Sequence, residues 1–299
     1  MLIDIRQHIV TLVAVFLALA VGLVLGSAFV GGTSMEKHVS KMLEKEFGKL
    51  RKENEQKQER VDALTEEIRR HQEFESMVAP YLTEARLARR GVAIIQTGDY
   101  DDAVESTRRA LESAGAVIHS VTSIHIADDD AEVRAARAVK AITGKTEEDD
   151  PINRVVSMLA NCISTGGNAS AVDIMESEKL ISKSGDYTRP AEVIILVGGC
   201  KEKSSLLPSS IDSVVIARLK SNGVSTIVGV EPSIVGTSCI RTYQEEGIST
   251  VDDIDQPLGK VALVYAILGS TGDFGLRKSA ERLVPKDMEL DSWMKKYRR

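Results

Sequence analysis

An uninterrupted apolar run lies near the start of the chain. Ile9 to Val30 contains 22 residues and no charged side chain. A helix of this run would reach about 33 Å, which is enough to cross a hydrocarbon core of about 30 Å. Gly22 and Gly26 are four residues apart, as in close membrane-helix contacts, although glycine is common in membrane helices without such contacts. We therefore predict a transmembrane anchor within residues 1–34.

A cleaved signal peptide is the alternative reading of this run. The apolar core of a signal peptide spans about 7–15 residues and follows a basic segment. Here the apolar run is longer, and Arg6 is offset by Asp4. Gly26-Ser27-Ala28 nevertheless supplies the small residues that a cleavage site uses. The length of the run favours the anchor, and the flanking charges give no orientation.

A heptad pattern follows the anchor and covers residues 35–85. Apolar positions recur at alternating spacings of four and three in a highly charged stretch, which predicts a coiled coil about 60 Å long. Asn54 takes an a position, where asparagine favours two strands in fixed register. Lys57, His71 and Glu75 on the same line favour the alternative of a single solvated helix, and Pro80 interrupts the helix near its end. The predicted seam consists of Leu43, Phe47, Leu50, Asn54, Val61, Leu64 and Ile68. We expect it to support a homo-oligomer or a coiled-coil heteromer.

From Gly91 onward, short apolar runs alternate with helical patterns. This alternation implies right-handed crossovers and a mostly parallel sheet, so we assign residues 90–299 to an α/β domain. The predicted strands cover 92–95, 116–126, 193–197 and 224–230, and the predicted helices cover 101–114, 131–142, 152–164, 211–221 and 261–268.

Ligands of such sheets bind outside the carboxyl ends of the strands. The loops expected there begin at Gln96, Gly198 and Glu231. We expect the acidic run near residue 253 either to cap the next helix or to bind a hard cation. The glycines near residue 272 are expected to form either an anion nest or a compact turn. The candidate cleft residues are Thr97, Gly98, Asp99, Gly198, Gly199, Asp252, Asp253, Asp255, Gly272 and Gly275.

Composition narrows the function classes. The formal charge of −6 argues against a nucleic-acid binder, and 43% hydrophobic residues can bury a core. Cys162, Cys200 and Cys239 show no paired spacing, which excludes a disulfide framework and a zinc knuckle. We find no catalytic triad, carboxylate pair or cofactor fingerprint, so the sequence predicts a protein that is not an enzyme and has no evident cofactor.

His119 and His125 are weak metal candidates. They are six residues apart, and on one strand they would point to the same face. Two imidazoles on one face can bind copper or zinc. Ordinary core or surface histidines are the alternative that we favour.

The chain resembles the MctB family, which is named copper transport outer membrane protein. The resemblance rests on Ile5-Arg6-Gln7-His8 and the apolar run after it, on Val197-Gly198-Gly199, and on Val251-Asp252-Asp253-Ile254-Asp255. It continues at Gly272-Asp273-Phe274-Gly275 and covers nearly the whole chain. The resemblance implies a single-pass envelope protein, mostly outside the cytoplasm and linked to copper homeostasis. A similar branch, the SteB-like proteins, implies instead a partner called SteA and a regulatory role in cell-wall hydrolysis and cell separation.

Overall fold

The computed structural model describes residues 5–30, 33–145, 149–202 and 207–286, and it divides into two units between Arg70 and His71. The first unit contains helix α1 (Ile5–Val30) and most of helix α2 (Thr33–Thr83). Among the described residues, one segment, His8–Ala28, is long and apolar enough to cross a membrane, with a mean hydropathy of 2.8. The predicted apolar helix and the long helix after it are confirmed. Pro80 does not end α2, which continues to Thr83.

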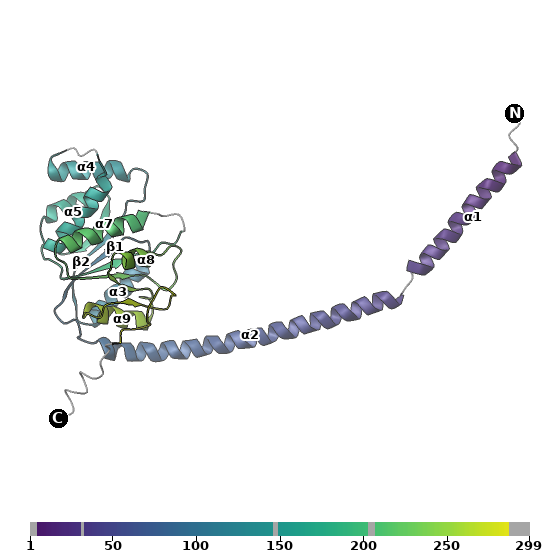
Figure 1. The fold of residues 1–299 in the computed structure, drawn as a ribbon, viewed down its shortest axis with the longest axis horizontal. Helices are drawn as coiled ribbons and strands as arrows, with labels where there is room; N and C mark the ends of the chain where they lie inside the picture. The colour runs from purple at the N-terminus through teal and green to yellow at the C-terminus, as the bar shows by residue number, and fades with distance from the viewer. Residues whose placement is uncertain (1–4, 31–32, 146–148, 203–206, 287–299) are drawn as a thin grey trace, which may run out of the picture. The chain divides into compact units, whose positions relative to one another are not determined.

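The second unit contains the end of α2 and a mixed α/β fold (Figure 1). Seven strands of the described residues form one sheet in the order β3-β2-β1-β4-β5-β6-β7, in which only the β2–β3 pair is antiparallel. The strands are β1 (Gly91–Gln96), β2 (Val117–Ile124), β3 (Ile181–Gly185), β4 (Val193–Val197), β5 (Thr226–Val230), β6 (Ser249–Val251) and β7 (Asp273–Phe274). The mostly parallel α/β fold is therefore confirmed.

Helices cover both faces of the sheet (Figure 1). They are α3 (Asp101–Ser113), α4 (Ala131–Thr143), α5 (Pro151–Thr165), α6 (Ala169–Ser177), α7 (Leu207–Ser221), α8 (Ile240–Glu245) and α9 (Pro257–Ile267). Side chains alternate across a strand, so Val92 and Ile94 pack with α3 and α9, whereas Ala93 and Ile95 pack with α4, α5 and α7. A strand that is buried on both faces consists of a continuous run of apolar residues, and this pattern allowed β1 and β4 to be predicted from the sequence.

The order of the strands fixes where the loops meet. β1 lies between β2 and β4. The chain therefore adds β2 and β3 along one edge of β1 and then crosses back to add β4 along the other edge. This reversal is a topological switch point, where a crevice opens outside the carboxyl ends of the two strands. The candidate cleft lies at this edge of the sheet.

Candidate functional site

The loops after β1 and β4 join at the switch point through backbone hydrogen bonds. The amides of Thr97 and Gly98 donate to the carbonyl oxygen of Val197 at 3.0 and 3.1 Å, and the amide of Asp99 donates to that of Gly199 at 3.2 Å. A Cβ on Gly98 would overlap the Gly199 carbonyl, so only glycine permits this approach. The structure therefore brings together the predicted cleft residues of the loops that follow β1 and β4.

The Asp99 carboxylate fixes the second of these loops. Both of its oxygens accept the amide of Lys201, at 2.9 and 3.2 Å. Gly199 has φ of 86°, a left-handed conformation that suits glycine in the turn after β4. The loop after β4 is thus a tight turn clamped by a carboxylate, and it lacks the spacing of a phosphate-binding fingerprint.

A cavity of about 480 Å³ opens beside this junction. Its volume falls within the usual range for small-molecule sites. Carboxylates, an amide, a hydroxyl and an imidazole line one part of it, and aliphatic side chains line the rest. The lining residues are Gln96, Thr97, Gly98, Asp99, Asp101, Ile124, His125, Ile126, Ala127, Asp128, Cys200 and Ile211.

A buried acid lies behind Thr97. The Thr97 hydroxyl donates to Asp212 Oδ1 at 2.6 Å, and the Asp212 side chain on α7 is fully buried. Burial raises the pKa of Asp212 to about 7, although the Thr97 hydrogen bond acts in the opposite direction. A second buried group, the Tyr243 hydroxyl on α8, has its pKa raised well above its ordinary value by burial and by the Asp212 charge.

Two glycines make room for the Tyr243 ring. A Cβ on Gly229 would overlap the ring, and a Cβ on Gly198 would overlap its hydroxyl. We expect Gly229→Ala to lower the free energy of unfolding by about 1–3 kcal/mol, because the fully buried ring has to move. Urea unfolding followed by circular dichroism measures this. Gly48→Ala adds a methyl group in open space on α2 and should cause no such loss, so equal losses in the two variants would contradict the steric explanation.

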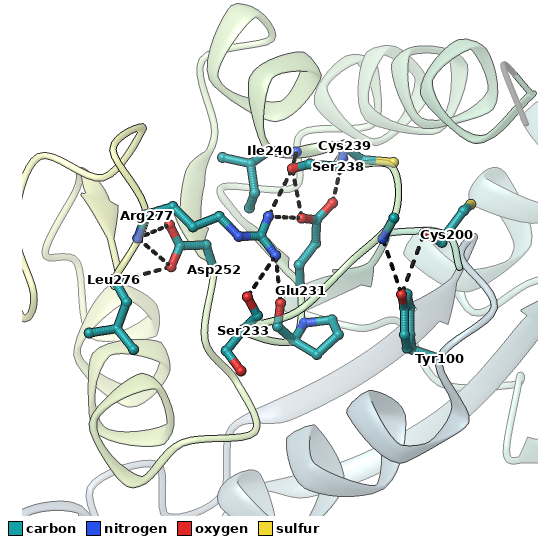
Figure 2. Close-up of polar contacts among 12 residues, drawn as sticks. Tyr100, Cys200, Glu231, Ser233, Ser238, Cys239, Ile240, Asp252, Leu276 and Arg277 are labelled. Atoms are coloured by element: carbon teal, nitrogen blue, oxygen red, sulfur yellow. Dashed lines mark hydrogen bonds and ion pairs between the residues drawn. The ribbon is translucent and has the colours of Figure 1, made fainter. Parts of the chain in front are cut away.

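A second polar cluster surrounds Glu231 at the end of β5 (Figure 2). Its fully buried carboxylate accepts Arg277 Nη1 at 2.7 Å, the Ser238 hydroxyl at 2.7 Å and the Cys239 amide. Arg277 Nη2 also donates to the Pro232 carbonyl oxygen at 2.7 Å. An ion pair between a fully buried carboxylate and a partly exposed guanidinium thus connects the loop after β5 to the segment after β7.

The predicted acidic run divides between three environments. Asp252 accepts the Leu276 amide at 2.8 Å and the Arg277 amide, and a Cβ on Gly275 would overlap its carboxylate (Figure 2). Asp255 instead accepts the amide and hydroxyl of Ser233 at 2.6 and 2.7 Å. Burial acts to raise the pKa of Asp255, but the bonds from Ser233 hold it below its ordinary value. Each of these two carboxylates thus fixes a neighbouring loop.

Asp253 is fully buried against Gly259 at the start of α9. Neither of its carboxylate oxygens has a hydrogen-bond partner among the described residues. Burial first, and then the charges of Asp252 and Asp255, raise its pKa to about 7. The predicted helix cap is not formed, since Gln256 is the residue at the cap position of α9 and no side chain there makes a capping bond.

Gly272 lies outside the cleft, which corrects its place in the predicted set. Its amide donates to the Ser249 hydroxyl at 3.3 Å, and Ser249 begins β6 at the opposite edge of the sheet. Gly275 lies at the other end of β7, where its amide donates to the Arg282 carbonyl oxygen at 2.9 Å. The two glycines therefore do not form a common anion nest.

The two histidines lie at opposite ends of β2. His119 lies over Gly91, at a point where the pairing register of β1 and β2 shifts. His125 follows the strand and shares a 2.7 Å hydrogen bond with Ser182 through Nε2. Six residues of extended chain separate them by about 20 Å, so the structure does not bring their imidazoles together at one site within the single chain.

The chain matches the family model described as "Copper transport outer membrane protein, MctB" over residues 2–285. It belongs to the MctB family. Similar proteins are the copper transporters MctB of Mycobacterium bovis and Mycobacterium tuberculosis, each 22% identical over 296 aligned residues. The match covers 89% of this chain and 92% of each relative. The MctB family description names transport and an outer membrane, and it names no catalysed reaction.

The side-chain types that can bind copper are not clustered in the described residues of this MctB-family chain. No group of three or more His, Cys, Asp or Glu side chains that could hold a metal ion is found there. Cys162, Cys200 and Cys239 are buried and form no disulfide among the described residues, and burial raises the pKa of Cys162 and Cys239. A high thiol pKa disfavours the thiolate that binds copper.

Three residues of the site escaped the sequence analysis. Arg277 lies in a segment without periodicity, and its partner Glu231 is 46 residues away. Tyr243 belongs to the short helix α8, which was not predicted. Asp212 offered a signal that was overlooked, since it is an acid among Ile211, Val214 and Val215 on a helix predicted to face the core. A charged residue on an apolar helix face is costly unless it is paired or protonated.

Proposed function

We propose that this chain is a single-pass, membrane-anchored envelope protein that takes part in copper homeostasis. The family match over residues 2–285 supports the link to copper, and the apolar helix supports the anchor. Most of the chain would lie on the extracytoplasmic side. Protease treatment of intact cells tests this placement: the α/β domain should be cleaved while a cytoplasmic marker stays whole, and protection of the domain would contradict it.

Copper content tests the proposed role directly. Cells that lack the gene should accumulate copper and grow poorly at raised copper concentration, and the intact chain should restore both properties. A chain without residues 1–34 should fail to restore them, because it has lost its anchor. Unchanged copper content and tolerance in the deletion strain would refute the role.

We further propose that α2 self-associates through its predicted seam. Leu50, Val61 and Ile68 are 54–58% exposed in the single chain, although they are large and apolar. Isolated long helices with such a stripe bury it against a partner helix. A second copy of the chain in parallel orientation places each seam position beside its own counterpart.

Disulfide trapping tests this pairing. We expect Leu50→Cys, on the seam, to give a covalent dimer under mild oxidation of the full chain in membranes. Lys52→Cys, two residues further along the helix and off the seam, is the matched control and should stay monomeric. The three native cysteines are buried and give a low background. Equal crosslinking of both variants, measured by non-reducing electrophoresis, would exclude the predicted register.

A scaffold that regulates cell-wall hydrolysis and cell separation, with a SteA-like partner, is the second candidate. The exposed apolar stripe of α2 favours it, because the same stripe suits a partner helix from another protein. Crosslinking in living cells from Leu50→Cys, on the stripe, would then yield a heteromer with an envelope protein, whereas Lys52→Cys, off the stripe, would not. Normal cell separation after deletion, together with an absence of such a heteromer, would remove this candidate.

A further inference from the structure

The cavity at the β1/β4 switch point has an acidic lining, which does not suit a nucleotide. Among the described residues, no lysine or arginine lines it, whereas Asp99, Asp101 and Asp128 do. The helix that begins beside it, α3, has Asp101 and Asp102 in its first turn. The positive end of that helix therefore already faces carboxylates, and a phosphate there would be repelled.

The lining carboxylates differ in how far neighbouring cations balance them. The exposed Asp128 pairs with the buried Arg134 at 3.0 Å, so a cation of the fold balances its charge. Among the described residues, Asp101 accepts the neutral amide of Gln96 at 3.0 Å, and Asp99 accepts the backbone amide of Lys201. In the described part of the chain, neither Asp99 nor Asp101 forms an ion pair, and both line the cavity.

A basic side chain in the loop after β4 packs against an aromatic ring and does not line the cavity. Lys201 Nζ lies 5.6 Å from the centre of the Tyr100 ring, a cation–π contact, and Lys201 is not among the residues that line the cavity. Part of the lining is aliphatic and includes Ile124, Ile126 and Ile211, of which Ile126 is almost fully buried. A ligand of this cavity therefore meets both aliphatic side chains and the carboxylates of Asp99 and Asp101.

We propose that this cavity binds a small organic cation, an ammonium or guanidinium group on a short aliphatic body. The cation pairs with Asp99 and Asp101, and the aliphatic part lies against Ile124, Ile126 and Ile211. A carboxylate–guanidinium pair at a half-enclosed site is stronger than one in open water, and the aliphatic lining adds the free energy of burial. This assignment does not depend on a role in copper homeostasis, and the two fail independently.

Thermal unfolding of the full chain in a nonionic detergent at low salt tests the assignment. Agmatine and butylamine are the probes, butan-1-ol is the neutral control of similar shape, and ATP is the anionic control. We expect saturable stabilisation by agmatine and butylamine, since a ligand of the native state raises the unfolding temperature. No shift with the amines, or a larger shift with ATP, would overturn the proposal.

Two aspartates of the same helical turn provide a matched pair of variants. Asp101→Asn removes the charge and keeps the oxygen that accepts from Gln96, so the loop should stay in place. Asp102→Asn removes an exposed charge that does not line the cavity. We expect about tenfold weaker agmatine binding in the first variant and unchanged binding in the second. Equal weakening in both, or in neither, would show non-specific attraction to the acidic surface and overturn the assignment.

Discussion

Replacing Arg277 by alanine should lower the free energy of unfolding by about 3–5 kcal/mol, the usual result of leaving a buried charge without its partner. Glu231 is fully buried, and the Arg277 guanidinium is the cation that pairs with it in the described structure. The substitution keeps the Arg277 amide and thus its bond to Asp252. Urea unfolding of the full chain, followed by circular dichroism, measures the loss.

Arg241→Ala is the matched control for this prediction. Arg241 pairs with Glu245 at 2.9 Å, but the two side chains are 87% and 66% exposed, and such pairs contribute at most about 1 kcal/mol. A second check is the double variant Glu231→Gln/Arg277→Ala. A neutral amide needs no cation, so part of the lost stability should return. A loss of similar size in the two single arginine variants would refute the role given to burial.

Stability should also fall as the pH rises from about 5 to about 8. Asp212 and Asp253 have folded-state pKa values of about 7, raised from 3.8 chiefly by burial. In that window the native state holds two protons that the unfolded chain has released, so raising the pH favours unfolding. The contribution of each acid is full below its unfolded pKa and is lost as the pH passes about 7.

The size of this loss of stability with pH follows from the pKa shift of each acid. A shift of about 3 pKa units corresponds to on the order of 4 kcal/mol for each acid as an upper bound. Asp212→Asn keeps an acceptor for the Thr97 hydroxyl and cannot ionise, so it should flatten the pH profile and stabilise the chain at pH 8 relative to the parent. Asp173→Asn, on the exposed side of α6, should leave the profile unchanged. Parallel profiles for Asp212→Asn and the parent would contradict the assignment.

Acids with lowered pKa act in a separate pH range. Asp186 and Asp255 have pKa values held below the ordinary value, Asp186 chiefly by hydrogen bonds from Thr188 and Asp255 by those from Ser233, which outweigh its burial. Their contribution is present above the unfolded pKa and is lost as the pH falls through the folded one. The two groups of acids therefore place the maximum of stability on the acidic side of neutrality.

The sequence determined the features that depend on neighbours along the chain. The apolar run of α1, the heptad pattern of α2 and the continuous apolar strand β4 (Val193–Val197) are local patterns, and the structure contains these elements at the expected places. Helix α4 was predicted to within a residue or so of its observed ends for the same reason. The loops after β1 and β4 could be placed together because parallel strands align their carboxyl ends.

Only the tertiary structure decided the features that depend on distant partners or on very short elements. Strand β3 (Ile181–Gly185) is a largely polar edge strand, and β6 and β7 span three and two residues, too few for a periodic pattern. Asp252, Asp253 and Asp255 are near neighbours in sequence, but their environments differ. Asp252 and Asp255 each hold a different loop, whereas the Asp253 carboxylate has no hydrogen-bond partner in the described part of the chain. The pairing of Glu231 with Arg277 joins two segments that only the closing of the sheet brings within hydrogen-bond distance, since burial and partner choice are properties of the packed fold.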